Sequence, residues 1–134
     1  MSLFQNVTGA TTRDCIIDSK MDRVIFIVNK GEMGLAIGRN GASIKNLQRL
    51  VGRPVELVEH SEDPKDFIRN SLNPKYVGDV RLTEKLDGTK IAVVVVDNRR
   101  KGAVVGKNGR NAEKARLLAK RYFQISNVHI VTQQ

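Results

Sequence analysis

The chain has 134 residues, 40% of them hydrophobic, and a formal net charge of +9. This composition excludes a wholly disordered protein, and the length predicts one ordinary domain or two very small ones. The longest apolar run, residues 91–96, is far shorter than the ~20 residues that cross a bilayer, and residues 1–6 do not resemble a secretory signal. One cysteine and two histidines exclude an intramolecular disulfide and a structural zinc set. We therefore expect a cytoplasmic protein with no metal, no cofactor and no membrane contact.

The positive charge is concentrated in the second half of the chain. Residues 1–67 hold nine basic and nine acidic residues, whereas residues 68–134 hold 14 basic and 5 acidic ones. Nine of the basic residues lie between Arg99 and Arg121, where Glu113 is the one acid. A solvated basic face would aid solubility, but concentration of charge beside a glycine-rich loop favours a polyanion as partner.

The first half of the chain predicts one unit of helix, two strands, two helices and a strand. Runs of β-branched residues predict the strands, and a helical spacing of Ile44, Leu47, Leu50 and Val51 predicts a helix with one buried face. In chain order the predicted elements are a short helix at 3–7, strands at 14–18 and 24–28, a short helix at 32–37, a glycine loop at 38–41, a longer helix, and a strand at 55–58.

The second half repeats this order after a shift of 68 residues. Over 27 aligned positions six residues are identical, and four of those six are glycines or lie in the loop between them. The pair Asp63-Pro64 predicts the start of the first helix, and Asp87-Gly88 predicts a hairpin. In chain order the predicted elements are a short helix at 67–72, strands at 80–86 and 91–96, a short helix at 100–105, a glycine loop at 106–109, a longer helix, and a strand at 128–131.

These repeats predict two domains, residues 1–61 and 62–134. The link between them is short and is not rich in glycine or serine, so it does not predict a free tether. Because a unit of this size buries only about 60% of its unfolded surface, each is marginal alone. We therefore expect the two units to pack against each other.

The glycine loops do not match either of two common nucleotide-binding patterns. The dinucleotide fingerprint places one residue between its first two glycines, whereas three residues separate Gly34 from Gly38. The Walker pattern needs four residues between its glycines and a hydroxyl after its lysine, whereas Gly102 and Gly106 are separated by three residues and Asn108 follows the lysine. Both patterns fail on spacing.

A G-x-x-G turn between two helices remains. Glycine lacks a Cβ, so a nucleic-acid backbone can approach closely, and the amides that begin the following helix favour an anion. Arg39 and Lys107 add positive charge inside the loops, and Asn40 and Asn108 suit a tight turn. A single G-x-x-G turn is a weak signal, but two copies in the same frame favour phosphate binding.

The residues around both loops resemble a known family. Residues 37–44 resemble the I-G-x-x-G-x-x-I signature of KH domains, and residues 105–112 are similar but end in Ala112. The order of elements resembles the type II (prokaryotic) KH fold, and the tandem pair resembles the archaeal NusA-like transcription factors. Residues 13–18 and 31–38 are the most specific parts of that likeness. The resemblance implies an α+β chain of two tandem type II KH domains.

This resemblance implies binding of single-stranded RNA, in which each loop clamps the backbone of about four nucleotides. The bases would lie over an aliphatic groove, which suits a chain with 4% aromatic residues. Ala112 predicts a shallower second groove, so we expect the second unit to supply affinity and the first to supply base preference. The implied groove residues are Ile37, Ile44 and Val105; the implied phosphate contacts are Arg39, Lys107, Arg110 and Lys114; and the remaining loop residues are Gly38, Asn40, Gly41, Gly106, Asn108 and Gly109.

Enzymes and protein-interaction modules fit this sequence less well. No clustered catalytic set is visible, so we expect no enzyme. A KH module that has lost RNA binding would favour acidic loops, whereas these loops are basic. Two settings stay open: transcription elongation or termination with RNA polymerase as partner, and a ribosome-assembly or ribosomal-protein-like role. The chain has no room for the polymerase-binding and S1 domains of bacterial relatives, and we expect a monomer.

Overall fold

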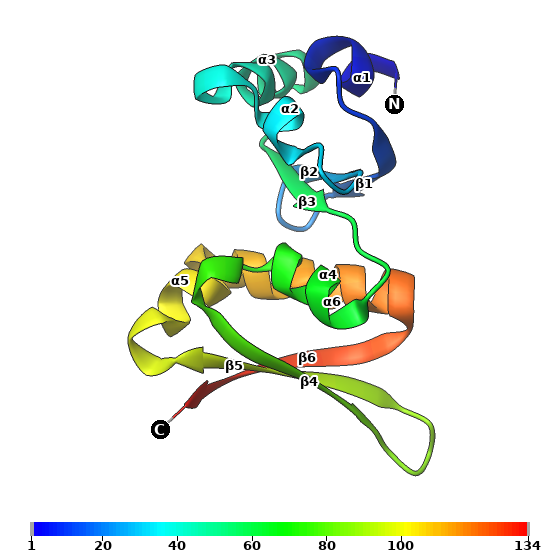
Figure 1. Cartoon of the computed structure of the whole chain (residues 1–134), viewed down its shortest axis with the longest axis vertical. Helices are drawn as coiled ribbons and strands as arrows, with labels where there is room; N and C mark the ends of the chain where they lie inside the picture. Colours follow the sequence, from blue (N-terminus) through cyan, green and yellow to red (C-terminus); the bar gives the residue numbers. More distant parts are fainter. Residues whose placement is uncertain (1, 134) are drawn as a thin grey trace. The chain divides into compact units, whose positions relative to one another are not determined.

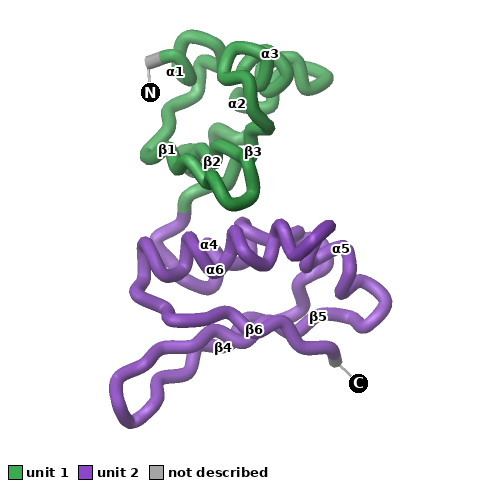
Figure 2. The backbone as a smooth tube through the Cα atoms, turned by 180° about the vertical axis from the view of Figure 1, so that it is seen from behind, with its two compact units in different colours: residues 1–60 green, residues 61–134 purple. Residues whose placement is uncertain are grey.

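The computed structural model describes residues 2–133, and the chain divides into two compact units between His60 and Ser61 (Figure 2). Apart from short 3-10 turns, each unit has the same order of elements: helix, strand, strand, helix, helix, strand (Figure 1). Each unit contains one three-stranded sheet. The predicted α+β class and the tandem repeat of one unit are therefore confirmed.

Unit 1 is built around its central strand, β2, which pairs antiparallel with β1 and parallel with β3. Its core joins Phe4, Phe26 and Leu47, and the two phenyl ring centroids lie 4.7 Å apart. This burial of apolar side chains holds the helices on the sheet. The elements are α1 (Ser2–Thr8), β1 (Thr12–Asp18), β2 (Arg23–Val28), α2 (Met33–Ile37), α3 (Ala42–Val51) and β3 (Val55–Glu59).

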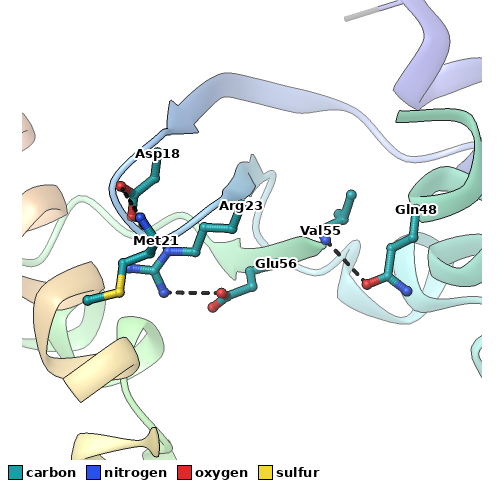
Figure 3. Close-up of polar contacts among 6 residues, drawn as sticks. All are labelled: Asp18, Met21, Arg23, Gln48, Val55 and Glu56. Carbon is teal, nitrogen blue, oxygen red and sulfur yellow. Dashed lines mark hydrogen bonds and ion pairs between the residues drawn. The ribbon is translucent and has the colours of Figure 1, made fainter. Parts of the chain in front are cut away.

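Polar contacts fix the start of β3 in unit 1 (Figure 3). The buried guanidinium of Arg23 donates through Nε to Asp18 at 2.8 Å and through Nη1 to Glu56 at 3.1 Å. At the first residue of β3, the amide of Val55 donates to the side-chain oxygen of Gln48 at 3.2 Å. Because Gln48 belongs to α3, this bond ties the helix that follows the first loop to the sheet.

Unit 2 repeats this topology, with the sheet order β4-β5-β6. Alternate residues of β5, namely Ala92, Val94 and Val96, enter the core, while α4 and α6 cover one face of the sheet (Figure 1). Asp63 caps α4 by accepting a bond from the amide of Lys65 at 2.9 Å. The elements are α4 (Pro64–Ser71), β4 (Val77–Glu84), β5 (Lys90–Asp97), α5 (Lys101–Val105), α6 (Arg110–Phe123) and β6 (Ile125–Gln133).

Several details of the expected elements differ from the structure. Strand β4 ends at Glu84, and Leu86 is fully exposed in the turn, where Gly88 has a φ of +88°. Leu50 is 56% exposed. On a helix it lies on the opposite side of Leu47 from Ile44 and Val51, so it falls off the buried stripe.

Within residues 2–133, no helix is both long enough and apolar enough to cross a membrane.

Candidate nucleic-acid interface

The first loop, Gly38–Gly41, connects α2 to α3 through a backbone that requires glycine at its first position. Gly38 has φ 78° and ψ 171°, a region that only glycine occupies readily. A Cβ placed on Gly38 would also lie 2.7 Å from the backbone nitrogen of Ser43. The start of α3 therefore packs directly against the bare Cα of Gly38.

The rest of the first loop is a left-handed turn. Asn40 has φ 57° and ψ 25°, and Gly41 has φ 75° and ψ 17°. Asparagine is among the few residues with a side chain that adopt this conformation at low cost. The amide of Gly41 donates to the carbonyl of Gly38 at 3.1 Å and closes the turn.

The second loop, Gly106–Gly109, has the same conformation between α5 and α6. Gly106 has φ 82° and ψ 164°, Asn108 has φ 58° and ψ 26°, and Gly109 has φ 74° and ψ 17°. A Cβ on Gly106 would lie 3.0 Å from the backbone nitrogen of Asn111. The G-x-N-G sequence thus forms one backbone structure twice in this chain.

Both loops present cations next to helix N-termini. Arg39, Asn40, Lys107 and Asn108 are all exposed. Among residues 2–133, no side chain caps the start of α3 or α6. The first amide of each helix, that of Ala42 or Arg110, donates to the carbonyl of Arg39 or Lys107. The amides that follow in the first turn carry partial positive charge beside a basic side chain. This combination binds anions such as phosphate.

The apolar surface next to the loops differs between the units. In unit 1, Ile37 is 41% exposed and Leu35 is 54% exposed, while Ile44 is half-buried. In unit 2, Val105 is half-buried, and the residue equivalent to Leu35 is the smaller Ala103. Leu35 was not among the expected site residues. The repeat could have indicated it, because Leu35 aligns with the smaller Ala103 and so distinguishes the two units.

Two cations of α6 differ in accessibility. Arg110 is the first residue of the helix and is half-buried, whereas Lys114 is 8% exposed. Helical spacing places both on one side of α6, but burial depends on tertiary packing, which spacing does not report. Lys114 is therefore a weaker candidate for a phosphate contact than Arg39 or Lys107.

Cys15 lies on β1, away from both loops in sequence, and its side chain is half-buried. Burial raises the pKa of its thiol above the usual range, so the thiolate form is disfavoured at neutral pH. Within residues 2–133, no group of three histidine, cysteine or acidic residues is placed to hold a metal ion.

Comparisons with known proteins identify this architecture. A KH domain model matches residues 1–82, and a model of the NusA-like second KH domain matches residues 64–133. The chain is 37% identical over 130 residues to the probable transcription termination protein NusA of Halobacterium salinarum, covering 97% of this chain and 91% of that protein. It is 34% identical to the protein of the same name from Methanococcus vannielii, covering 98% of this chain and 74% of that one.

A solved structure is also similar. The crystal structure of APE1850 has a TM-score of 0.86 and 37% sequence identity, and the match covers 97% of this chain and 94% of that one. With matched family models over both units and relatives matched over most of their length, the family is established. The chain belongs to the NusA-like family of tandem KH-domain proteins.

Proposed function

We propose that this chain is a transcription termination or antitermination factor that binds single-stranded RNA through its two G-x-x-G loops. The observation that carries the proposal is the repeated loop, with matching dihedral angles at Gly38 and Gly106 and an exposed cation after each. A KH loop of this kind clamps the sugar–phosphate backbone of single-stranded RNA. The name of these relatives, probable transcription termination protein NusA, supports transcription termination as the setting.

Each loop would hold phosphate through three kinds of group. First-turn amides after Ala42 or Arg110 would donate hydrogen bonds, the cation at Arg39 or Lys107 would add charge, and the asparagine would offer a side-chain donor. Glycine at 41 and 109 leaves room for close approach; a Cβ on Gly109 would meet nothing within 4 Å. Arg110 would add a further phosphate contact in unit 2.

The bases would lie beside the loops on aliphatic surface. Ile37, Leu35 and Ile44 offer this surface in unit 1, whereas the equivalent residues of unit 2 are the smaller Val105, Ala103 and Ala112. Base preference would therefore reside mainly in unit 1. Unit 2 carries most of the excess positive charge, +7 of the total +9, and would supply more of the affinity.

RNA polymerase is the partner we propose over ribosomal particles, because the relatives are named for transcription termination. Affinity purification of the chain from its native cells, with RNase treatment as one arm, separates the two. Recovery of polymerase subunits after RNase treatment supports the proposal, and recovery of ribosomal proteins alone contradicts it.

RNA binding is tested by fluorescence anisotropy of short single-stranded RNAs across a salt series. Two variants reverse charge in one loop each: Arg39→Asp with Asn40→Asp, and Lys107→Asp with Asn108→Asp. We expect both to bind more weakly, with a salt slope shallower by about 0.7 for each lost phosphate contact. Aspartate also tolerates left-handed backbone, so the turns are retained.

The matched control changes the same charge elsewhere. Lys20→Asp with Ser19→Asp alters two exposed residues in the turn between β1 and β2. We expect this variant to bind nearly as well as the unmodified chain. If the loop variants, shown folded by circular dichroism, bind no worse than the control, the loops are not the clamp.

A further inference from the structure

A group of cations at the start of α5 has no equivalent in unit 1. Residues 98–101 are Asn-Arg-Arg-Lys, whereas the residues 68 positions earlier, 30–33, are Lys-Gly-Glu-Met. The first segment carries three positive charges, and the second is neutral. The repeat therefore preserves the backbone here but not the charge.

The ring of Tyr76 contacts Arg100 of this group and one further cation, Lys75. The guanidinium carbon of Arg100 lies 4.9 Å from the centre of the Tyr76 ring, and the ammonium of Lys75 lies 5.7 Å from it. Such contacts stabilise by about 0.5–1 kcal/mol at exposed sites and hold the side chains in place. We call Lys75, Arg99, Arg100 and Lys101 the cationic cluster.

The charge of this cluster is largely uncompensated. Arg99 approaches Asp97 at 3.6 Å, but both side chains are exposed, and such pairs contribute little. Within residues 2–133, no ion pair joins Lys75, Arg100 or Lys101 to a carboxylate, although Arg100 is near enough to help lower the pKa of the exposed Asp97. The cluster is therefore available to an external anion.

The residues between the cationic cluster and the second loop have small side chains. Helix α5 has five residues, so the cluster and the loop are separated by about 7.5 Å along its axis. Gly102 and Ala103 are exposed, and a Cβ on Gly102 would meet nothing within 4 Å. In unit 1 the bulkier Leu35 occupies this exposed face.

We propose that the cationic cluster is a second phosphate-binding site, so that an RNA strand held by the second loop continues along α5 and is held again at its start. This inference rests on the proposed function. Arginine recognises phosphate through paired hydrogen bonds, and Arg99 and Arg100 supply two guanidinium groups. Unit 2 then covers more nucleotides than unit 1, which has no such site. RNA is preferred over an acidic protein segment because the cluster adjoins a phosphate-binding loop on the same short helix.

The test measures the binding of two RNAs to the full chain. The parent protein for this test carries Arg39→Asp and Asn40→Asp, so that unit 2 makes most of the contribution to RNA binding. One RNA has about four nucleotides, the length that one loop clamps, and the other is about twice as long. The cluster variant is Arg99→Gln, Arg100→Gln and Lys101→Gln. The control, Arg81→Gln, Lys85→Gln and Lys90→Gln, removes the same charge from exposed residues of the β4–β5 hairpin.

We expect the parent to bind the longer RNA more tightly than the shorter one. The cluster variant should bind the longer RNA no more tightly than the shorter one, and should keep its affinity for the shorter RNA. Its salt slope on the longer RNA should be about 2 units shallower, at about 0.7 for each lost contact. The control should keep the gain. Equal affinities of cluster variant and control for the longer RNA would overturn the inference.

Two further arms distinguish a failure of the cluster from a failure of the loop. If Lys107→Asp with Asn108→Asp leaves the parent's RNA binding unchanged, the proposed function itself fails. Polyglutamate tests an acidic protein segment as the ligand: cluster-dependent binding of polyglutamate tighter than that of the longer RNA would overturn the inference. Circular dichroism shows whether each variant is folded.

Discussion

At the scale of single residues, glycine at 38 is required for two separate reasons. Its backbone angles lie in a region closed to side chains, and the backbone nitrogen of Ser43 occupies the space that a Cβ would need. Gly102 differs in both respects, because it lies within α5 at negative φ with open space around it. The two glycines therefore form a matched pair for mutation.

We expect Gly38→Ala to lower the free energy of unfolding by about 1–3 kcal/mol, the cost of a strained backbone residue. Gly102→Ala should be neutral or stabilise by up to about 1 kcal/mol, because alanine favours helix over glycine. Urea unfolding followed by circular dichroism measures both. A Gly38→Ala variant as stable as Gly102→Ala would show that the loop is not built as described.

At the scale of elements, the sequence predicted the order of helices and strands because runs of β-branched residues, helix caps and turn residues act on the backbone near them. β-branched runs define β2 and β5, and Asp63-Pro64 begins α4 as expected. The errors depend on tertiary packing. Strand β6 begins at Ile125, three residues before the predicted start, because its pairing with β5 extends to Lys90.

In the candidate site, too, local sequence predicted the backbone but not the burial of side chains. The loop sequences G-R-N-G and G-K-N-G predicted the turns, since glycine and asparagine adopt the left-handed backbone. The exposure of Leu35 and the burial of Lys114 depend on how α2 and α6 pack, and no local pattern reports that. The roles of the loop residues in RNA binding stay predictions.

The cap of α4 offers a test at this scale. Asp63→Ala removes the acceptor of the Lys65 amide bond, and we expect it to cost about 0.5–2 kcal/mol of stability. Asp66→Ala deletes a carboxylate from the same helix that is paired with Arg69 only at the surface, so it should cost a few tenths of a kcal/mol, about 0.3. Thermal unfolding of both variants checks the order; a loss from Asp63→Ala no larger than that from Asp66→Ala would contradict a specific contribution of the cap.

At the scale of the whole molecule, the two units share one fold but differ in net charge. Residues 1–60 carry a net charge of +2, whereas residues 61–134 carry +7. Since phosphate contacts dominate affinity and its salt dependence, binding through unit 2 should respond more strongly to salt. Two loops on one chain also let a strand that is held at one loop reach the other at high effective concentration.

The central claim is that RNA lies on the two loops, and photo-crosslinking of RNA that contains 4-thiouridine tests it most directly. We expect mass spectrometry to find crosslinked bases on peptides from α2 to the start of α3 and from α5 to the start of α6, near Leu35, Ile37 and Val105. Charge reversal in both loops should abolish these crosslinks. Crosslinks confined to α4 or to the β4–β5 hairpin, and unchanged by loop reversal, would contradict the account.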